Sequence, residues 1–391
     1  MKANTDFIPF ALPDIGKDEE DAVLRVLRSG WITTAAEAKA FEEEFARYVG
    51  SPHALAVNSA TAGLHLALEA LGVGPGDKVI TTPYTFTATA EVMRYLGADP
   101  LFVDIEPGTF HLDPAGVRKA LAGEKGRVKA VLPVHIAGEA RGLGSILDAA
   151  REHGVPVVED AAHAFPALTG EGYAGTRGDV GVYSFYATKT ITTGEGGMVV
   201  TSRRDVAQRV AMMRLHGIDR EIWNRYTDKG ASWRYAVVEA GYKYNMTDIA
   251  AALGRVQLRR AQEFLAKRRA IAEKYIRAFS GRDYLIPPAD SEGHAWHLFL
   301  LRLNASRCGL SRDEFIGRLT EEGIGTSVHF IPLHIHPYYA KRYGFQPEDF
   351  PEAYKTFLHV ISLPVYPAMT EEQVERVIRA VLKTGDSGRQ T

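Results

Sequence analysis

The sequence has little cysteine and no long apolar run. Cys308 is the only cysteine among 391 residues, so no internal disulfide can form, which is typical of a protein from a reducing compartment. No stretch reaches the roughly 18 consecutive apolar residues that a membrane-spanning helix requires. The stretch from Met1 to Phe10 lacks the continuous apolar core of a signal peptide. We therefore expect a globular, cytoplasmic protein.

The sequence also lacks an excess of either charge, a glycine fingerprint after its first predicted strand and the nucleophile motif of serine hydrolases. It has 46 Lys and Arg residues against 48 Asp and Glu residues, and neither tail carries a run of like charges. We therefore expect neither nucleic acid nor a membrane as a partner. The loop Asn58-Ser-Ala-Thr-Ala-Gly63, which follows the first predicted strand, is not Gly-x-Gly-x-x-Gly, and this disfavours a Rossmann dehydrogenase. The absence of Gly-x-Ser-x-Gly disfavours a serine hydrolase.

Short apolar segments alternate with helical patterns over the first two-thirds of the chain. We expect strands at residues 54–57, 78–81, 101–104, 128–134 and 155–159. Helices are expected at residues 64–71, 88–95, 114–121 and 147–153. Continuous apolar strands separated by helices predict an α/β fold, with a mostly parallel sheet covered on both faces. Ligands of such sheets bind at the carboxyl ends of the strands.

The pattern changes near residue 248. Residues 249–275 read as one long amphipathic helix. Beyond it we expect a strand at 297–303, a helix at 312–322, a strand at 324–330, a helix at 370–383 and a loose tail at 385–391. We divide the chain into a large domain, residues 1–250, and a smaller C-terminal α/β domain, residues 251–391.

Lys189 stands between two apolar segments. Val182-Tyr-Ser-Phe-Tyr precedes it, and a glycine-rich turn followed by Met198-Val-Val-Thr comes after it. A lysine enclosed by buried strands is costly when charged, so it tends to lose its proton and become a nucleophile for carbonyl carbon. This suggests a Schiff base with pyridoxal phosphate. A loop lysine whose amine simply reaches water is the alternative.

Asp160 and His163 follow the predicted strand 155–159, and both suit the ring of this cofactor. Asp160 would keep a pyridine nitrogen protonated, although it could also simply cap the helix that follows. His163 could donate a hydrogen bond to the phenolic oxygen, but a structural histidine is equally compatible with the sequence. The pair His334 and His336 shares one face of an extended segment without nearby acidic residues, so we expect no metal site.

Three further strand ends offer parts of a cofactor site. Asn58-Ser-Ala-Thr-Ala-Gly63 opens a helix whose free N–H groups could bind a phosphate, or it is a plain N-cap. Phe86 could stack on a flat ring or belong to the core. Ser184 could donate to a phosphate or bond the backbone.

Taken together, these residues are similar to the sugar aminotransferases of the DegT/DnrJ/StrS family, which are fold type I pyridoxal phosphate enzymes. The resemblance covers nearly the whole chain. It is carried by Ser29-Gly-Trp-Ile-Thr-Thr, Asn58-Ser-Ala-Thr, Pro133-Val-His-Ile-Ala-Gly, Glu159-Asp-Ala-Ala-His, Ser184–Gly197, Arg214-Leu-His-Gly-Ile, Gly241-Tyr-Lys-Tyr-Asn-Met-Thr-Asp-Ile, His294-Ala-Trp-His-Leu-Phe and Ser362-Leu-Pro-Val-Tyr-Pro.

The resemblance implies a role for each matched position. Lys189 would be the Schiff-base lysine and Asp160 the partner of the ring nitrogen. The phosphate would be bound by the backbone of Ala60 and Thr61, helped by Ser184. Further implied residues are Phe86 and His163 at the ring, Asn245 reaching the phosphate from the neighbouring subunit of a homodimer, and Trp31, Thr33 and His329 near the substrate. For His329 a satisfied strand histidine is the alternative.

The family implies transfer of an amino group, with glutamate as donor, to the keto group of a nucleotide-diphosphate-linked sugar. Lys189 argues against the dehydratase branch, which has histidine there. The motifs Thr192-Thr-Gly-Glu-Gly-Gly and Gly241-Tyr-Lys-Tyr-Asn are similar to those of the C4-specific group. Thr33-Thr-Ala-Ala departs from the frequent Thr-Thr-Gly-Pro, in a loop near the sugar. The alternatives are a C3-specific enzyme, an amino-acid aminotransferase with Arg225 or another arginine for the substrate carboxylate, and a catalytically idle regulator that binds the cofactor.

Overall fold

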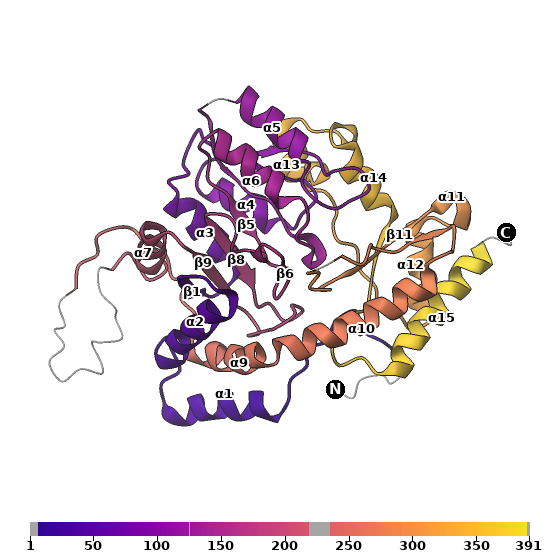
Figure 1. Ribbon diagram of the computed structural model, residues 1–391, viewed down its shortest axis with the longest axis horizontal. Helices are drawn as coiled ribbons and strands as arrows, with labels where there is room; N and C mark the ends of the chain where they lie inside the picture. Colours follow the sequence, from indigo (N-terminus) through magenta and orange to yellow (C-terminus); the bar gives the residue numbers. More distant parts are fainter. Residues whose placement is uncertain (1–6, 125, 219–234, 292, 389–391) are drawn as a thin grey trace.

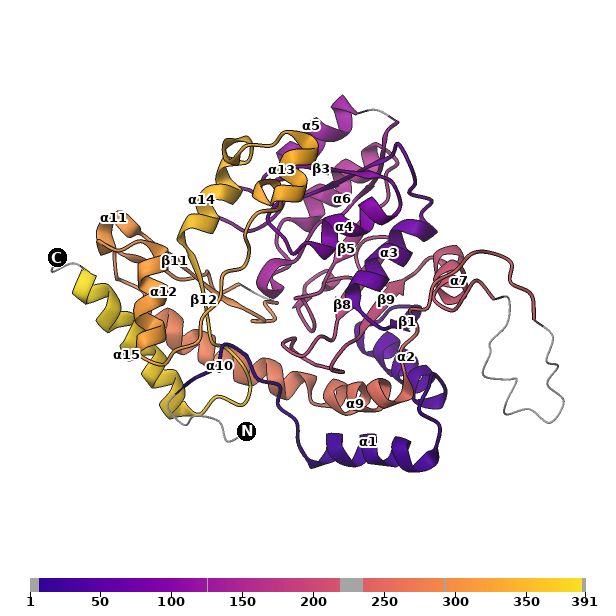
Figure 2. The same ribbon diagram turned by 180° about the vertical axis from the view of Figure 1, so that it is seen from behind.

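Two sheets organise the chain. The computed structural model describes residues 7–124, 126–218, 235–291 and 293–388. Helices α9 (Asp248–Arg259) and α10 (Ala261–Phe279) run one after the other from the region of the first sheet to that of the second (Figures 1 and 2). Among the described residues, no helix has the length and apolar character needed to cross a membrane.

The first sheet is mixed and almost entirely parallel, as predicted. Its strands are β1 (His53–Val57), β2 (Lys78–Thr81), β3 (Asp99–Phe102), β4 (Val128–Val131), β5 (Val158–Asp160), β8 (Val180–Ser184) and β9 (Gly197–Thr201). They form the groups β3-β2-β4 and β5-β8-β9-β1, which parallel bridges at Val131–Val157 and Val134–Asp160 bring together. Only β9 is antiparallel to its neighbours, β8 and β1. The carboxyl ends of the other strands therefore share one edge.

Alternate residues of these strands pack against helices on opposite faces. Val57 and Val182 belong to a cluster with α3 (Ala60–Ala70), α4 (Ala88–Tyr95) and α7 (Arg204–Met213). Their neighbours Ala56 and Tyr183 belong to another with α2 (Ala36–Val49) and α9. Ile80 packs with α5 (Pro114–Gly123) and α6 (Leu143–Glu152). Because both faces are covered, the strands are apolar on both sides, which explains why they read as continuous apolar runs.

The second sheet is small and antiparallel, with the order β10-β11-β12. Its strands are β10 (Leu285–Ile286), β11 (Phe299–Leu303) and β12 (Val360–Leu363). Helices α10, α12 (Arg312–Glu321) and α15 (Glu371–Gly388) share a core with it. Ile8 joins this core and bridges to Ile324, so part of the N-terminal segment packs with the C-terminal region. The division near residue 250 stays our proposal.

Shorter elements fill the connections. They are α1 (Lys17–Ser29), η1 (Ile136–Gly138), β6 (Leu168–Thr169), β7 (Gly172–Tyr173), α11 (Ala305–Cys308), η2 (Leu333–Ile335), α13 (Pro337–Tyr343), η3 (Pro347–Asp349) and α14 (Pro351–His359). Helix α1 lies beside α9, away from the first sheet (Figure 1). The helices α13 and α14 lie near the β3 end of that sheet (Figure 2).

Several predicted boundaries were wrong. The long helix is divided at Arg260, whose N–H donates to the carbonyl oxygens of both Val256 and Gln257 and so tightens the last turn of α9. Residues 324–330 form no strand. They make only isolated bridges, from Ile324 to Ile8 and from Ser327 to Ser362 at the outer edge of β12. The expected tail is helical as far as Gly388, and the strands β3 and β5 are shifted by one to three residues.

Candidate active site

The predicted cofactor residues from the first sheet follow its strands at their carboxyl ends. Asp160 is the last residue of β5, and Ser184 is the last residue of β8. Ala60 begins α3, which follows β1, and Phe86 lies between β2 and α4. The shared direction of these strands brings the four positions to one edge of the sheet, which is where ligands of parallel sheets bind.

Lys189 lies in the turn between β8 and β9. Its backbone N–H donates to Tyr186 O at 2.9 Å, and the residue is partly exposed rather than fully buried. Its amine is nevertheless deep enough that burial lowers the pKa to about 8, against a smaller opposing effect of the Asp160 carboxylate. The amine therefore has an accessible neutral form near physiological pH while staying reachable for a substrate.

Asp160 is a buried carboxylate with two donors. The Thr89 hydroxyl donates to Oδ2 at 2.8 Å, and the Ala162 N–H donates to Oδ1 at 3.2 Å. Burial raises the pKa of Asp160, and these two hydrogen bonds together with the Lys189 charge oppose the rise. The Thr85 hydroxyl lies 2.7 Å from that of Thr89, so Thr85 donates to Thr89 if Thr89 donates to Asp160. The sequence analysis missed this threonine pair.

The neighbouring Glu159 has a structural function. It is fully buried and accepts hydrogen bonds from the N–H groups of Gly175, Arg177 and Gly178 at 2.6–2.7 Å. His135 Nε2 lies 2.7 Å from its Oε2. Burial alone would raise the pKa of Glu159, but the bonds from His135 and the backbone outweigh it and lower the pKa. The result is a rigid support directly before Asp160.

His163 and His329 both lie within electrostatic reach of Lys189. Burial lowers the pKa of His163 well below its usual value, and Lys189 lowers it further. The Ala137 N–H donates to Nδ1 of His163 at 3.3 Å, so the ring proton of the neutral form lies on Nε2, where it can be donated to a ligand. Burial lowers the pKa of His329 to about 4. Its Nδ1 lies 2.8 Å from Ser362 Oγ, and its ring stacks on Phe10 at 5.4 Å.

A third histidine, His297, was not among the predicted site residues. Its Nε2 lies 3.5 Å from the Nζ of Lys189, and its ring lies 4.4 Å from that of His163. The motif that contains it was recognised in the sequence. However, nothing in the spacing of that motif indicated that a residue 108 positions away from Lys189 would reach its amine.

The beginning of α3 offers backbone N–H groups that could hold an anion. Ser59 caps the helix by accepting from the Ala62 N–H at 3.1 Å, and the N–H groups of Ala60 and Thr61 have no such acceptor in the described part of the chain. Gly197 passes so close that a Cβ there would lie 2.8 Å from the Ala60 nitrogen. The side chain of Ser184 accepts from the Tyr186 N–H at 3.3 Å, which leaves its hydroxyl proton available.

Phe86 presents a largely free aromatic face. It is 59 % exposed, and its ring lies 6.2 Å from that of Phe330, which stacks with His163 at 5.8 Å. The core alternative for Phe86 therefore does not hold. An exposed aromatic ring beside buried site residues can stack on a flat ligand.

Trp31, Thr33 and Asn245 form a second group. The Thr33 carbonyl oxygen accepts from the Asp248 N–H at 3.2 Å, and the Asn245 amide donates to the Thr34 hydroxyl. Asn245 also forms an antiparallel bridge with Val57, at the end of β1. Trp31 is 42 % exposed. Asn245 and the segment Thr33–Thr34 are therefore held together within one chain, and Trp31 and Thr33 are exposed. Arg225 lies outside the described residues.

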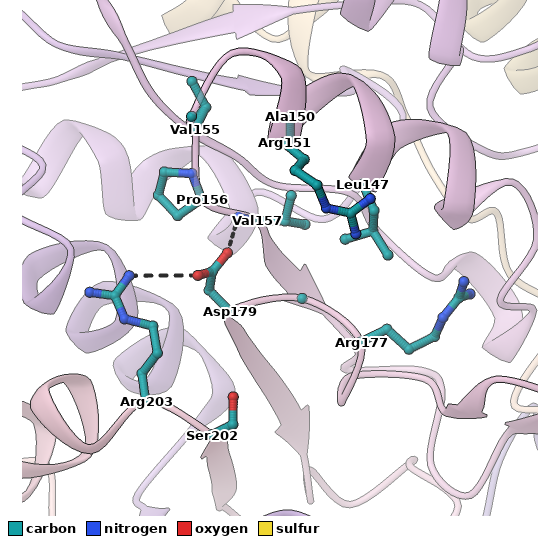
Figure 3. Close-up of a pocket in the computed structure, with 12 residues that line it drawn as sticks. Leu147, Ala150, Arg151, Val155, Pro156, Val157, Arg177, Asp179, Ser202 and Arg203 are labelled. Atoms are coloured by element: carbon teal, nitrogen blue, oxygen red, sulfur yellow. Dashed lines mark hydrogen bonds and ion pairs between the residues drawn. The ribbon is translucent and has the colours of Figure 1, made fainter.

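Other polar features lie apart from Lys189. His334 donates from Nε2 to the Pro347 carbonyl oxygen at 3.2 Å, and the described residues contain no group of three or more His, Cys, Asp or Glu side chains arranged to hold a metal. A pocket of about 440 Å³ lies at the amino-terminal ends of β5 and β8, with Arg151, Arg177 and Arg203 in its wall (Figure 3). It contains none of the predicted site residues and lies at the edge of the sheet opposite to Asp160 and Ser184.

Comparison with known proteins agrees with this geometry. Residues 13–382 match the family described as the DegT/DnrJ/EryC1/StrS aminotransferase family. The spore coat polysaccharide biosynthesis protein SpsC of Bacillus subtilis is 46 % identical over 384 residues, 97 % of this chain and 98 % of that protein.

This chain belongs to the DegT/DnrJ/EryC1/StrS aminotransferase family. Two solved structures resemble it over nearly their whole length. The putative sugar aminotransferase Spr1654 from Streptococcus pneumoniae, in its PMP form, has a TM-score of 0.90 at 31 % identity and covers 97 % of this chain and 100 % of its own. DesI, determined in the presence of its TDP-sugar product, has a TM-score of 0.86 at 28 % identity and covers 99 % and 95 %.

Membership confirms the predicted fold and enzyme class. The aminotransferase has the fold type I architecture, it is a sugar aminotransferase, and its family uses pyridoxal phosphate. The residues described above fit that cofactor. They supply a buried amine of lowered pKa on Lys189, the buried carboxylate of Asp160, the exposed ring of Phe86 and a helix N-terminus that Gly197 approaches closely. Such a cofactor supplies an aldehyde for the amine and a protonated ring that withdraws electrons.

Proposed function

We propose that this aminotransferase moves the amino group of L-glutamate to the C4 keto group of a nucleotide-diphosphate-linked 4-keto sugar. The observation that carries the proposal is the position of Lys189, whose amine of lowered pKa lies in one site with the Asp160 carboxylate and with histidines that burial keeps neutral. An amine of this kind both attacks carbonyl carbon and, once released, exchanges a proton with a neighbouring carbon.

Each residue near Lys189 has one task in this proposal. Lys189 holds the cofactor covalently and, when free, moves the proton between the substrate carbon and the cofactor. Asp160 pairs with the protonated ring nitrogen, and that positive charge offsets the burial that otherwise raises its pKa. His163 donates its Nε2–H to the phenolic oxygen, since its Nδ1 is occupied by Ala137. Phe86 covers one face of the ring.

The phosphate and the substrate use the remaining residues. The N–H groups of Ala60 and Thr61 and the Ser184 hydroxyl bind the phosphate at the positive end of α3. His329, which Ser362 and Phe10 hold in place, faces the sugar. The printed description of DesI, with its TDP-sugar product, supports a nucleotide-linked substrate. The motifs ending in Gly197 and Asn245 support position C4.

The proposal includes a homodimer with shared active sites. Asn245 bonds Thr34, the residue after Thr33, within one chain, and the surface nearby exposes Trp31 and the residues Leu24 and Leu27 of α1. Apolar side chains gathered on a surface commonly mark an interface between subunits. In the dimer, Asn245 of the partner subunit reaches the phosphate bound at Ala60 and Thr61, while Trp31 and Thr33 line the sugar-binding side.

Spectroscopy of the purified enzyme tests the reaction. With pyridoxal phosphate bound, glutamate should bleach the absorption band of the covalently held cofactor, and a nucleotide-linked 4-keto sugar should restore it. Restoration by 3-keto sugars alone would indicate the C3 enzyme, and restoration by keto acids alone would indicate an amino-acid aminotransferase. If no amino donor bleached the band, the protein would be a regulator rather than a transaminase. Lys189→Ala should retain no cofactor after borohydride reduction and denaturation.

Subunit complementation tests the shared site. Lys189→Ala and Asn245→Ala are each expected to lose activity as homodimers. In a mixed dimer one site combines an intact Lys189 with Asn245 of the partner subunit, so re-association of equal amounts should recover about a quarter of the wild-type activity, by random pairing of a symmetric dimer. A mixture that recovers no activity although mass spectrometry shows mixed dimers would refute the role of Asn245 across the interface.

A further inference from the structure

His297 is held rigidly where the two sheets meet. The backbone N–H of His297 donates to the Ala137 carbonyl oxygen at 3.0 Å, and the backbone carbonyl oxygen of His297 accepts from the Arg268 guanidinium at 3.3 Å. Trp296, the residue before it, has a φ of 49°, in the left-handed region that side chains rarely adopt. Arg268 is itself buried and also bonds Trp296 O and Val365 O. The backbone of His297 is therefore held by contacts on both sides, and this fixes the point from which the imidazole extends.

The ring of His297 has one polar contact in the described part of the chain. Its Nε2 lies 3.5 Å from the Lys189 Nζ, while its Nδ1 is buried without a hydrogen-bond partner. A residue that only filled this space would be better served by an apolar side chain, because a buried polar atom without a partner costs free energy. The contact with Lys189 is the one feature that accounts for a histidine here.

Charged and titratable groups surround this contact from several elements. Asp160 faces Lys189 from β5, His163 follows that strand, and His329 comes from the C-terminal region. Arg268 reaches His297 from α10. Burial lowers the pKa of His297 well below its usual value, and Lys189, His163, Arg268 and His329 lower it further. A neutral imidazole can accept a hydrogen bond from an ammonium group, whereas a charged imidazole would repel that group.

We propose that His297 is a positioning residue that accepts a hydrogen bond from the free amine of Lys189 at Nε2 and fixes the direction in which that amine points. The inference deepens the proposed role of Lys189 and rests on it. When the amine is released from the cofactor, it stays directed by His297 instead of rotating through its side-chain conformers, so its lone pair returns to the same place after each proton transfer. Because the acceptor stabilises the ammonium form, it also keeps the pKa of Lys189 from falling further.

The test measures the Lys189 amine itself, in the full-length chain freed of cofactor. The rate at which a small acylating reagent labels Lys189 is followed against pH by peptide mass spectrometry. His297→Leu keeps the bulk and removes the acceptor, so the labelling midpoint should fall by about one pH unit, the size expected for a hydrogen bond to a charged group. His297→Gln keeps an acceptor near the Nε2 position and should stay close to the wild-type midpoint.

His65→Leu is the matched control. His65 is likewise a buried histidine with one unpartnered nitrogen, and its other nitrogen lies 3.2 Å from the Tyr244 hydroxyl, not from Lys189. The control should leave the Lys189 midpoint unchanged. An unchanged midpoint in folded His297→Leu would overturn the proposal. If His297→Leu did not fold, His297→Asn would replace it, because the asparagine oxygen lies one bond short of the Nε2 position. Equal labelling midpoints for His297→Asn and His297→Gln would overturn the proposal, and a lower midpoint for His297→Asn would support it.

The holoenzyme gives a second, independent reading. In single turnover with glutamate, His297→Leu should slow bleaching of the cofactor band about tenfold and leave the glutamate concentration for half-maximal rate nearly unchanged, because His297 contacts the amine rather than the donor. A labelling shift without any glutamate-dependent bleaching in the wild type would refute the proposed function and leave the His297–Lys189 contact standing. The two failures are therefore distinguishable.

Discussion

Replacing Thr89 by valine removes the donor to Asp160 without leaving a cavity. The Thr89 hydroxyl donates to Oδ2 of Asp160 at 2.8 Å, and both residues are buried. A hydrogen bond to a charged group contributes roughly 1.5–3 kcal/mol. The pKa of Asp160, which burial already raises, should therefore rise further when this donor is removed.

The sign of the pH dependence follows from this rise. A carboxyl group whose folded pKa lies above its unfolded value stabilises the fold fully only below the unfolded pKa, and that contribution is lost as pH increases through the folded pKa. Thr89→Val raises the folded pKa further, so the cofactor-free variant should be less stable than the wild type by roughly 1.5–3 kcal/mol at a pH above the folded pKa of Asp160 in both proteins. The difference should shrink as pH falls through these two pKa values. Melting temperatures measured across this range report it as a shift of a few degrees.

Thr81→Val is the matched control for Thr89→Val. Thr81 is also fully buried, and its hydroxyl donates to the Leu132 carbonyl oxygen at 2.8 Å, which does not titrate. Its valine variant should lose about 1 kcal/mol at every pH. Thr89→Val should also slow the half-reaction with glutamate about 10- to 100-fold, because a carboxyl group that is partly protonated supports the ring nitrogen less well. A destabilisation by Thr89→Val that is as independent of pH as that of Thr81→Val would refute the reasoning.

Three further changes test separate parts of the site. Glu159→Gln removes the carboxylate to which His135 and the Gly175 N–H bond in a fully buried position, so the free energy of unfolding should fall by about 3 kcal/mol or more. The melting temperature measures this loss, and an unchanged melting temperature would contradict the supporting role of Glu159. Gly197→Ala would place a Cβ 2.8 Å from the Ala60 nitrogen, so the dissociation constant of pyridoxal phosphate should rise about tenfold or more in a fluorescence titration. The control is Gly74→Ala, whose Cβ would have no heavy atom within 4 Å and which should leave the dissociation constant unchanged. Phe86→Ala should weaken binding of the cofactor by about 1 kcal/mol in the same titration. It should not lower the melting temperature, because Phe86 is 59 % exposed, and a large loss of stability would mean that the ring belongs to the core.

The sequence predicted the layout of the site well where the function depends on strand ends. Asp160 and Ser184 end strands, and Ala60 begins the expected helix, because apolar runs bounded by small or polar residues already show where each strand stops. The class of enzyme came from the resemblance of whole motifs. The individual roles of these residues stay predictions, to be tested by the experiments above.

Contacts between distant segments could not be predicted in the same way. Thr89 reaches Asp160 over 71 positions, and periodicity shows that both face inward but not that they meet. The C-terminal helix continues to Gly388, although glycine weakens helices. The helix packs so closely here that a Cβ at Gly385 would lie 2.1 Å from the Tyr284 ring, and one at Gly388 would lie 2.4 Å from the Cys308 carbonyl oxygen. At these positions tertiary packing requires glycine and overrides local propensity.

The three histidines show what such contacts do to the chemistry of the site. Burial lowers the pKa of His163 and His297 well below the usual value and that of His329 to about 4, so all three are neutral above pH 6. Lys189, with a pKa of about 8, loses its proton as pH rises through that value. The three histidines therefore add no titration of their own in the range in which Lys189 loses its proton. A sequence in which the same three positions were half-exposed would place histidine titrations close to that of the lysine, so it is the burial of the imidazoles that keeps their titrations apart from that of the amine.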